Sequence, residues 1–143
     1  MSVRTYDPKA VVVTINGIPM SGYSDGTFVE IDRNEPTWNM VVGADGLVTR
    51  GKTNNFSGTL TLTLKQSSPS NDVLSSLMAI DEATNTGIFP VLVKDLSGNS
   101  IYFSATAWIN QYANSTFDKA ITDRQWTLSL AQADIFVGSN SET

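Results

Sequence analysis

The sequence of 143 residues contains no cysteine and no histidine. The lack of cysteine excludes disulfides, thiolate zinc sites and a cysteine nucleophile. The lack of histidine removes the most common general base and excludes a Ser-His-Asp triad. Because these two absences leave few routes to catalysis, we expect no enzymatic activity, no cofactor and no bound metal ion.

Positive charge is also scarce. Nine Lys and Arg residues stand against fourteen Asp and Glu residues, for a net charge of −5. Binding to nucleic acid through phosphate contacts requires the opposite sign, so we do not expect it. No apolar run approaches the ~20 residues of a transmembrane helix, and the first ten residues lack a signal-peptide pattern, so no membrane anchor is expected. Charged residues make up only 16% of the chain, and depletion of charge is typical of surfaces buried in self-association.

Alternation of apolar and polar residues with a period of two dominates the chain. In 56–65, Leu60, Leu62 and Leu64 alternate with Thr59, Thr61 and Thr63, as in a half-buried antiparallel strand. Further strands are predicted at 9–15, 27–33, 37–42, 47–52, 88–94, 100–110, 124–131 and 134–137.

Turn residues connect several of these strands into hairpins. Asn16-Gly17 follows the first strand as a two-residue turn, and the Gly-rich segment 43–46 joins 37–42 to 47–52. Pro90 should lie at a strand start or at a sheet edge, since it cannot donate a ladder hydrogen bond. The strand 100–110 has one face made of Ile101, Phe103, Ala105, Ala107 and Ile109, while Tyr102 and Trp108 lie on the other.

One segment has helical spacing instead. Ser68 can cap a helix, Pro69 suits its first turn, and Asp72 complements the helix dipole. Apolar residues then recur at helical spacing up to about Ile80 or Asp81: Val73, Leu74, Leu77 and Met78. The predicted fold is therefore mainly β, with two packed antiparallel sheets (a β-sandwich or barrel) and one flanking α-helix. We expect one domain over 1–143, with flexible ends at about 1–7 and 138–143.

Candidate sites for chemistry are few. Glu30 and Asp32 share one face of a strand, where a glycosidase pair is one interpretation and a solvated or lumen-lining face is the favoured one. The aromatic residues Trp38, Trp108 and Trp126 are expected to be core or interface anchors more than a sugar-stacking platform. Asp118 and Asp123 suit surface turns better than a site for a hard cation.

Several blocks of the sequence resemble the tail tube proteins of contractile-tailed bacteriophages. The likeness runs from about Tyr6 to Gly138, and its most specific parts are 6–17 and 66–74; other matching blocks are 22–28, 42–46, 57–64 and 93–98. It implies a subunit that forms six-membered rings, which stack into a tube inside a contractile sheath and conduct the genome into the host. It further implies contacts with other copies, sheath, baseplate and tail terminator proteins, and passage of DNA without specific binding. The protein would be located in the virion after assembly in the bacterial host cytoplasm.

On this resemblance we expect two sets of functional residues. The lumen-facing set is Glu30, Asp32, Thr59, Thr61 and Thr63. The set reaching the next ring is Asp45, Gly46, Arg50, Lys52, Asn54 and Asn55, with Arg50 and Lys52 meeting Asp81 or Glu82 there. Two alternatives remain open: another ring-forming tail or secretion-tube component, and a carbohydrate-binding or ligand-binding β-sandwich.

Overall fold

The computed structural model describes residues 2–142. The elements in chain order are the 3-10 turn η1 (Pro8–Ala10), β1 (Val11–Ile15), β2 (Ile18–Pro19), β3 (Val29–Arg33), β4 (Trp38–Val42), β5 (Val48–Lys52), β6 (Gly58–Lys65), α1 (Ser70–Thr84), β7 (Phe89–Asp95), β8 (Ile101–Gln111), β9 (Asp123–Leu130) and β10 (Asp134–Phe136). Most of the predicted strands therefore exist close to their expected limits.

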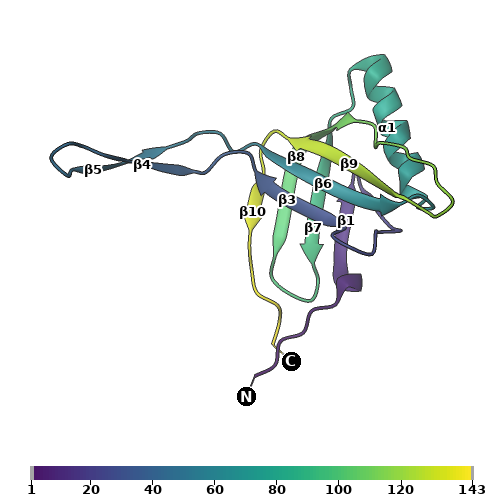
Figure 1. The fold of residues 1–143 in the computed structure, drawn as a ribbon, viewed down its shortest axis with the longest axis horizontal. Helices are drawn as coiled ribbons and strands as arrows, with labels where there is room; N and C mark the ends of the chain where they lie inside the picture. Colours follow the sequence, from purple (N-terminus) through teal and green to yellow (C-terminus); the bar gives the residue numbers. More distant parts are fainter. Residues whose placement is uncertain (1, 143) are drawn as a thin grey trace.

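Within residues 2–142 the strands form two antiparallel sheets. Eight of them make one sheet in the order β2-β1-β7-β8-β9-β6-β3, with β10 paired to β8, while β4 and β5 pair only with each other. The large sheet folds over, so that β9, β6 and β3 cross in front of β8, β7 and β1 (Figure 1). The mainly β fold with two antiparallel sheets and one helix is confirmed. The two layers that enclose the core are halves of the same sheet, which continues from β8 into β9.

The core lies between these two layers. Leu60, Leu62 and Leu64 of β6 are fully buried, as their alternation predicted. They pack in one cluster with residues from β1, β7, β8 and β9, among them Trp126 and Leu128. The period-two pattern thus fixes which side of β6 and β9 faces inward, and the opposite side is left to water or to a partner.

Strand β8 differs from the prediction in its side-chain pattern. Ala107 and Ile109 are buried, but Ile101 and Phe103 are exposed, and Tyr102 packs against the core in their place. The cause is a bulge. Val91 pairs with Ser104 whereas Phe89 pairs with Ala107, so three residues of β8 oppose two of β7. One extra residue moves the alternation to the other face, so the prediction that Ile101 and Phe103 share a face with Ala107 and Ile109 is wrong.

Helix α1 begins close to the predicted start and runs further than predicted. The Ser68 Oγ accepts a hydrogen bond from the Ser70 N–H at 3.2 Å, and Leu74 is buried against the sheet. The helix ends at Thr84, because Asn85 takes a left-handed conformation with φ 57° and its N–H donates to the Asp81 carbonyl. The predicted end at about Ile80 or Asp81 is therefore three to four residues too early.

The first and last segments of the described chain lie side by side at the bottom of the body (Figure 1). Arg4 pairs with Glu142 through an isolated bridge, and the Ser141 N–H donates to the Ser97 carbonyl at 2.8 Å. These contacts hold part of the two segments predicted to be flexible, whose mobility stays a prediction. Met1 and Thr143, which belong to those segments, lie outside the described residues.

Candidate functional surfaces

One outer face of the folded sheet is polar. On β3, Glu30 pairs with Thr61 and Asp32 pairs with Thr59, so these four side chains stand on the same side of the sheet. On β9 the same rows continue, because Thr61 pairs with Thr127 and Thr59 with Ser129. We call this surface the polar face, and its members are Glu30, Asp32, Thr59, Thr61, Thr63, Gln125, Thr127 and Ser129. The structure thus brings together all five residues predicted to line a lumen.

The chemistry of the polar face is that of a hydrated wall. The Thr59 hydroxyl donates to Asn34 Oδ1 at 2.8 Å, and the Ser129 hydroxyl donates to Asn110 Oδ1 at 2.7 Å. Glu30 and Asp32 are exposed and face threonines across the strand pair, not a second carboxylate on an opposing element. A glycosidase needs two carboxyl groups flanking the scissile bond. The arrangement on β3 does not provide that geometry.

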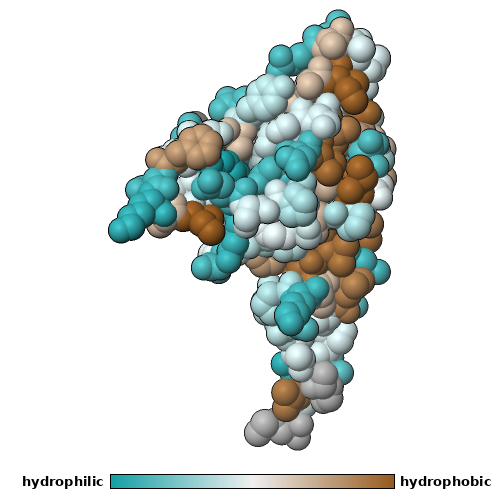
Figure 2. Space-filling model, turned by 90° about the vertical axis from the view of Figure 1, so that its right-hand side faces the viewer, coloured by the Kyte–Doolittle hydropathy of each residue, from teal (hydrophilic) through white to brown (hydrophobic). Residues whose placement is uncertain are grey.

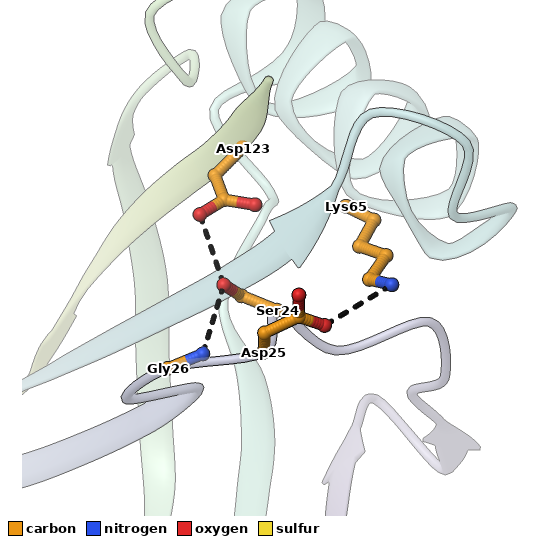
Figure 3. Close-up of polar contacts among 5 residues, drawn as sticks. All are labelled: Ser24, Asp25, Gly26, Lys65 and Asp123. Carbon is orange, nitrogen blue, oxygen red and sulfur yellow. Dashed lines mark hydrogen bonds and ion pairs between the residues drawn. The ribbon is translucent and has the colours of Figure 1, made fainter. Parts of the chain in front are cut away.

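A polar cluster ties the loop before β3 to one end of the polar face (Figure 3). Ser24 Oγ donates to Asp123 Oδ2 at 2.9 Å and accepts from the Gly26 N–H at 3.4 Å. Lys65 Nζ lies 3.2 Å from Asp25 Oδ1. Asp123, weighed as a cation ligand in the sequence, therefore holds a loop hydroxyl, and no group of three or more metal-ligating side chains exists among residues 2–142.

The second candidate surface is a hairpin that projects away from the body (Figure 1). We call residues 37–53, which contain β4 and β5, the arm. All five residues of β4 are exposed, and its apolar side chains include Trp38, Met40 and Val42. The Arg50 guanidinium carbon lies 3.8 Å from the centre of the Trp38 ring. Exposed apolar groups on an isolated hairpin indicate a surface that is covered by something else.

The base of the arm is anchored to the body. Arg33 donates from Nη2 to the Ala133 carbonyl at 2.9 Å, and its guanidinium carbon lies 5.0 Å from the centre of the Phe56 ring. The Ala133 N–H donates to the Phe56 carbonyl at 2.7 Å. Where the arm begins and ends, the Thr53 N–H donates to the Thr37 carbonyl, also at 2.7 Å. The body thus sets the direction in which the arm leaves it.

The residues predicted to reach a neighbouring ring lie in three places on the arm and directly after it. Asp45 and Gly46 are at the tip, and Arg50 and Lys52 are on β5. Asn54 and Asn55 lie at the base, where Asn55 Oδ1 accepts from the Ser57 N–H and hydroxyl. The side chain of Asn55 therefore shapes the return to the body.

A third feature was missed in the sequence analysis. Arg124 shares the inward alternation of Trp126 and Leu128, and the structure buries it beside a pocket of about 490 Å³. Its guanidinium carbon lies 5.2 Å from the centre of the Phe117 ring. At the same pocket, desolvation and then the neighbouring Glu82 carboxylate raise the pKa of the Tyr112 hydroxyl. A charged residue in phase with a buried apolar row was the available signal.

The three tryptophans do not form one platform. Trp126 is buried and donates its indole N–H to Asn71 Oδ1 at 3.0 Å. Trp38 is exposed on the arm, and Trp108 is half-buried on β8. Trp126 is a core residue, as favoured in the sequence analysis. No helix within the described part of the chain is both long and apolar enough to span a membrane.

Comparisons with known proteins point to one family. The family model described as the bacteriophage PhiTE tail tube protein matches residues 4–138. Structural protein ORF10 of Pseudomonas phage KPP10 is 36% identical over 146 residues, which cover 96% of this chain and 84% of that protein.

Two solved structures share the fold of this chain. The sheath/tube terminator of the PVC extracellular contractile injection system superposes with a TM-score of 0.67 at 10% identity, over 94% of this chain and 99% of that one. A chain of the PVC sheath-tube complex in its extended state gives a TM-score of 0.66 at 12% identity, over 92% and 91%.

Proposed function

Because the chain belongs to the phage tail tube family and is a structural protein of the tail, we propose that six copies close into a ring. Stacked rings then form a hollow tube that conducts the genome into the host from within a contractile sheath. The similar solved chains come from a sheath-tube complex and a sheath/tube terminator, which supports sheath and terminator proteins as partners. A baseplate protein at the other end, assembly in the host cytoplasm and a role without catalysis belong to the same proposal.

The ring closes by pairing of strand edges. Strand β3 pairs with β6 along one edge, and the end of β8 beyond Ala107 pairs with β9 but not with β7. These two edges border the layer β3-β6-β9-β8, so the β3 edge of one copy can pair with the β8 end of the next and leave no open edge. Four strands from each of six copies would give a barrel about 48 Å across its backbone, for a strand spacing of about 4.8 Å and a tilt of about 40°. That width accommodates a DNA duplex.

The polar face lines the lumen of this barrel. The observation that carries the proposal is its composition: hydroxyl and amide groups with the carboxylates Glu30 and Asp32, all on one side of three adjacent strands. The only cation of the cluster in Figure 3 is Lys65, which is paired with Asp25. A negative wall repels the phosphate backbone at distances up to about 8 Å at physiological salt, so the DNA passes without binding.

Negative-stain electron microscopy of the purified protein tests this function. Long hollow tubes, or rings that stack, are the expected result. Closed rings that never stack would favour the alternative of another ring-forming tail or secretion-tube component. Monomers that stay monomers at high concentration and across salt and pH would contradict the proposal and favour a ligand-binding β-sandwich.

A further inference from the structure

Arg124 is a buried cation that forms no ion pair with any carboxylate among residues 2–142. The residue is only 6% exposed. Its Nη1 donates to Thr122 Oγ1 at 2.7 Å and to the Asp123 carbonyl at 3.1 Å, and its Nη2 donates to the Thr116 carbonyl at 3.2 Å. All three acceptors are neutral oxygens, and the ion pairs recorded for residues 2–142 involve Arg4 and Lys65 instead. A buried charge is costly to keep without an opposite charge, so this site favours an anionic partner.

The pocket beside Arg124 is shaped for a carboxylate that carries apolar neighbours. Three aromatic rings line it, those of Tyr112, Phe117 and Trp126. Ser115 forms part of the wall, together with polar side chains of the first turns of α1. The positive end of the helix dipole adds to the guanidinium charge on that side. A free inorganic anion would leave the aromatic surface uncovered, whereas a peptide segment with one acidic residue would cover it.

We propose that this pocket receives the arm tip of a second copy of the chain, with the carboxylate of Asp45 against the Arg124 guanidinium. Asp45 is the one charged residue in the tip segment 43–48. Its Oδ1 accepts from the Leu47 N–H at 3.1 Å within the turn, so Oδ2 is the oxygen that would meet the guanidinium. Around it stand the exposed apolar side chains Val42, Leu47 and Val48, of which Leu47 is 67% exposed. One carboxylate among aliphatic groups thus meets one cation among aromatic rings. The inference rests on the self-assembly proposed above and names the two surfaces that meet in it.

The arm and the pocket lie at opposite ends of the molecule. In Figure 1 the arm extends along the long axis, while α1 and the loop 112–122 lie at the far end. Figure 2 views that far end, where hydrophobic side chains reach the surface among polar ones. A tip cannot reach the pocket of its own chain, so the contact joins different surfaces of two copies. Such a contact repeats from copy to copy, as an assembly of rings requires.

The rim of the pocket offers a second charge pair to the same arm. The Glu82 carboxylate lies beside the Tyr112 hydroxyl at this rim, and Arg50 follows the tip on β5. A docked arm would bring Arg50 toward Glu82, which agrees with the sequence-based expectation for that pair. Asp81, the other residue expected there, already accepts from the Gly87 N–H at 3.0 Å. Glu82 in turn accepts from the Tyr112 hydroxyl, so each of the two acidic groups already has one partner in its own chain.

Cross-linking tests the contact directly, because the chain has no cysteine of its own. In the double variant Ala44→Cys/Ser115→Cys, one thiol lies next to Asp45 and the other on the pocket wall. A disulfide forms only where the two Cα atoms come within about 7 Å. Mild oxidation of the assembled double variant should give a ladder of covalent dimers, trimers and larger species on a denaturing gel. Each single variant, treated identically, should give none.

A charge variant supplies the second readout. Asp45→Asn should raise the concentration needed for half-maximal assembly by about tenfold or more, since it removes one partner of a buried charge pair. Glu35→Gln makes the same charge change nearer the base of the arm, and it should shift this concentration less than about twofold. Equal shifts in the two variants, or assembly without the ladder, would overturn the contact while leaving the tube proposal intact. A double variant and a parent chain that both stay monomeric would overturn the contact together with the proposed function.

Discussion

Removing the arm should abolish assembly and leave the body folded. The arm can be deleted cleanly because the Thr53 N–H donates to the Thr37 carbonyl at 2.7 Å, so the two ends of the deleted stretch are already adjacent. Replacing 38–52 by Asn-Gly closes the chain with a two-residue turn that suits antiparallel strands. None of the buried core residues lies in the deleted stretch.

The size of the stability effect follows from that geometry. The body keeps its whole core, and changes at exposed sites usually alter the free energy of unfolding by no more than about 0.5 kcal/mol. Shortening the connection from about 17 to about 4 residues lowers the closure entropy cost by about 1 kcal/mol. The free energy of unfolding should therefore be unchanged or higher by about 1 kcal/mol in urea unfolding followed by the fluorescence of Trp108 and Trp126, the two tryptophans that the deletion retains. Sedimentation of the same sample should show monomers at concentrations where the parent assembles.

Two results would refute this reasoning. A loss of more than about 2 kcal/mol in the free energy of unfolding would mean that the arm supports the body. Tubes of normal length from the shortened chain would mean that the arm is not an assembly contact.

Three further predictions concern the polar face, the core and the arm. Glu30→Lys/Asp32→Lys should leave tubes intact but lower genome delivery, measured as infectivity of phage carrying the variant; full infectivity would argue against the lumen role. Leu62→Ala should lower the free energy of unfolding by about 2–5 kcal/mol, because the side chain is fully buried. Its neighbour Thr61→Ala, on the opposite face, should change it by less than about 1 kcal/mol, and similar losses in the two variants would contradict the assignment of faces. Backbone amides of β4 and β5 should exchange rapidly with solvent in the monomer and slowly in tubes, since an isolated hairpin is only marginally stable; slow exchange in the monomer would show that the arm is stable alone.

The sequence predicted those strands whose alternation is unbroken. The pattern of β6 identified its buried leucines and its outward threonines, and Asn16-Gly17 identified a turn in which both residues have positive φ, 53° and 77°. The arm was also predicted as a hairpin nearly to the residue. These features are predictable because they are local: which side of a strand a residue occupies follows from the residues two positions before and after it.

Features that depend on distant pairing were not predictable in the same way. The bulge opposite Pro90 reversed the faces of half of β8, and it is defined by the register of the pairing with β7, which is distant in sequence from much of β8. The pairing of β10 with β8 and the folding of one sheet into two layers also depend on tertiary contacts. The alternation of β9 places Arg124 in phase with Trp126 and Leu128, which indicates its burial, but it gives no hint of the neighbours Phe117 and Thr116, which come from a preceding loop.

Residues 2–142 leave three features of the free subunit incomplete: an open edge at β3, an arm whose apolar groups are exposed, and a buried guanidinium that forms no ion pair. Other copies of the chain can satisfy all three, and the contacts differ in strength. The buried Asp45–Arg124 pair favours docking of the arm, but the entropy cost of ordering a marginal hairpin opposes each single docking event. A copy that docks only its arm is therefore weakly held, whereas a copy that also pairs its β3 edge gains both contacts for one loss of free motion. Assembly should for this reason favour closed rings over isolated pairs, so dimers should be scarce at every stage of tube growth.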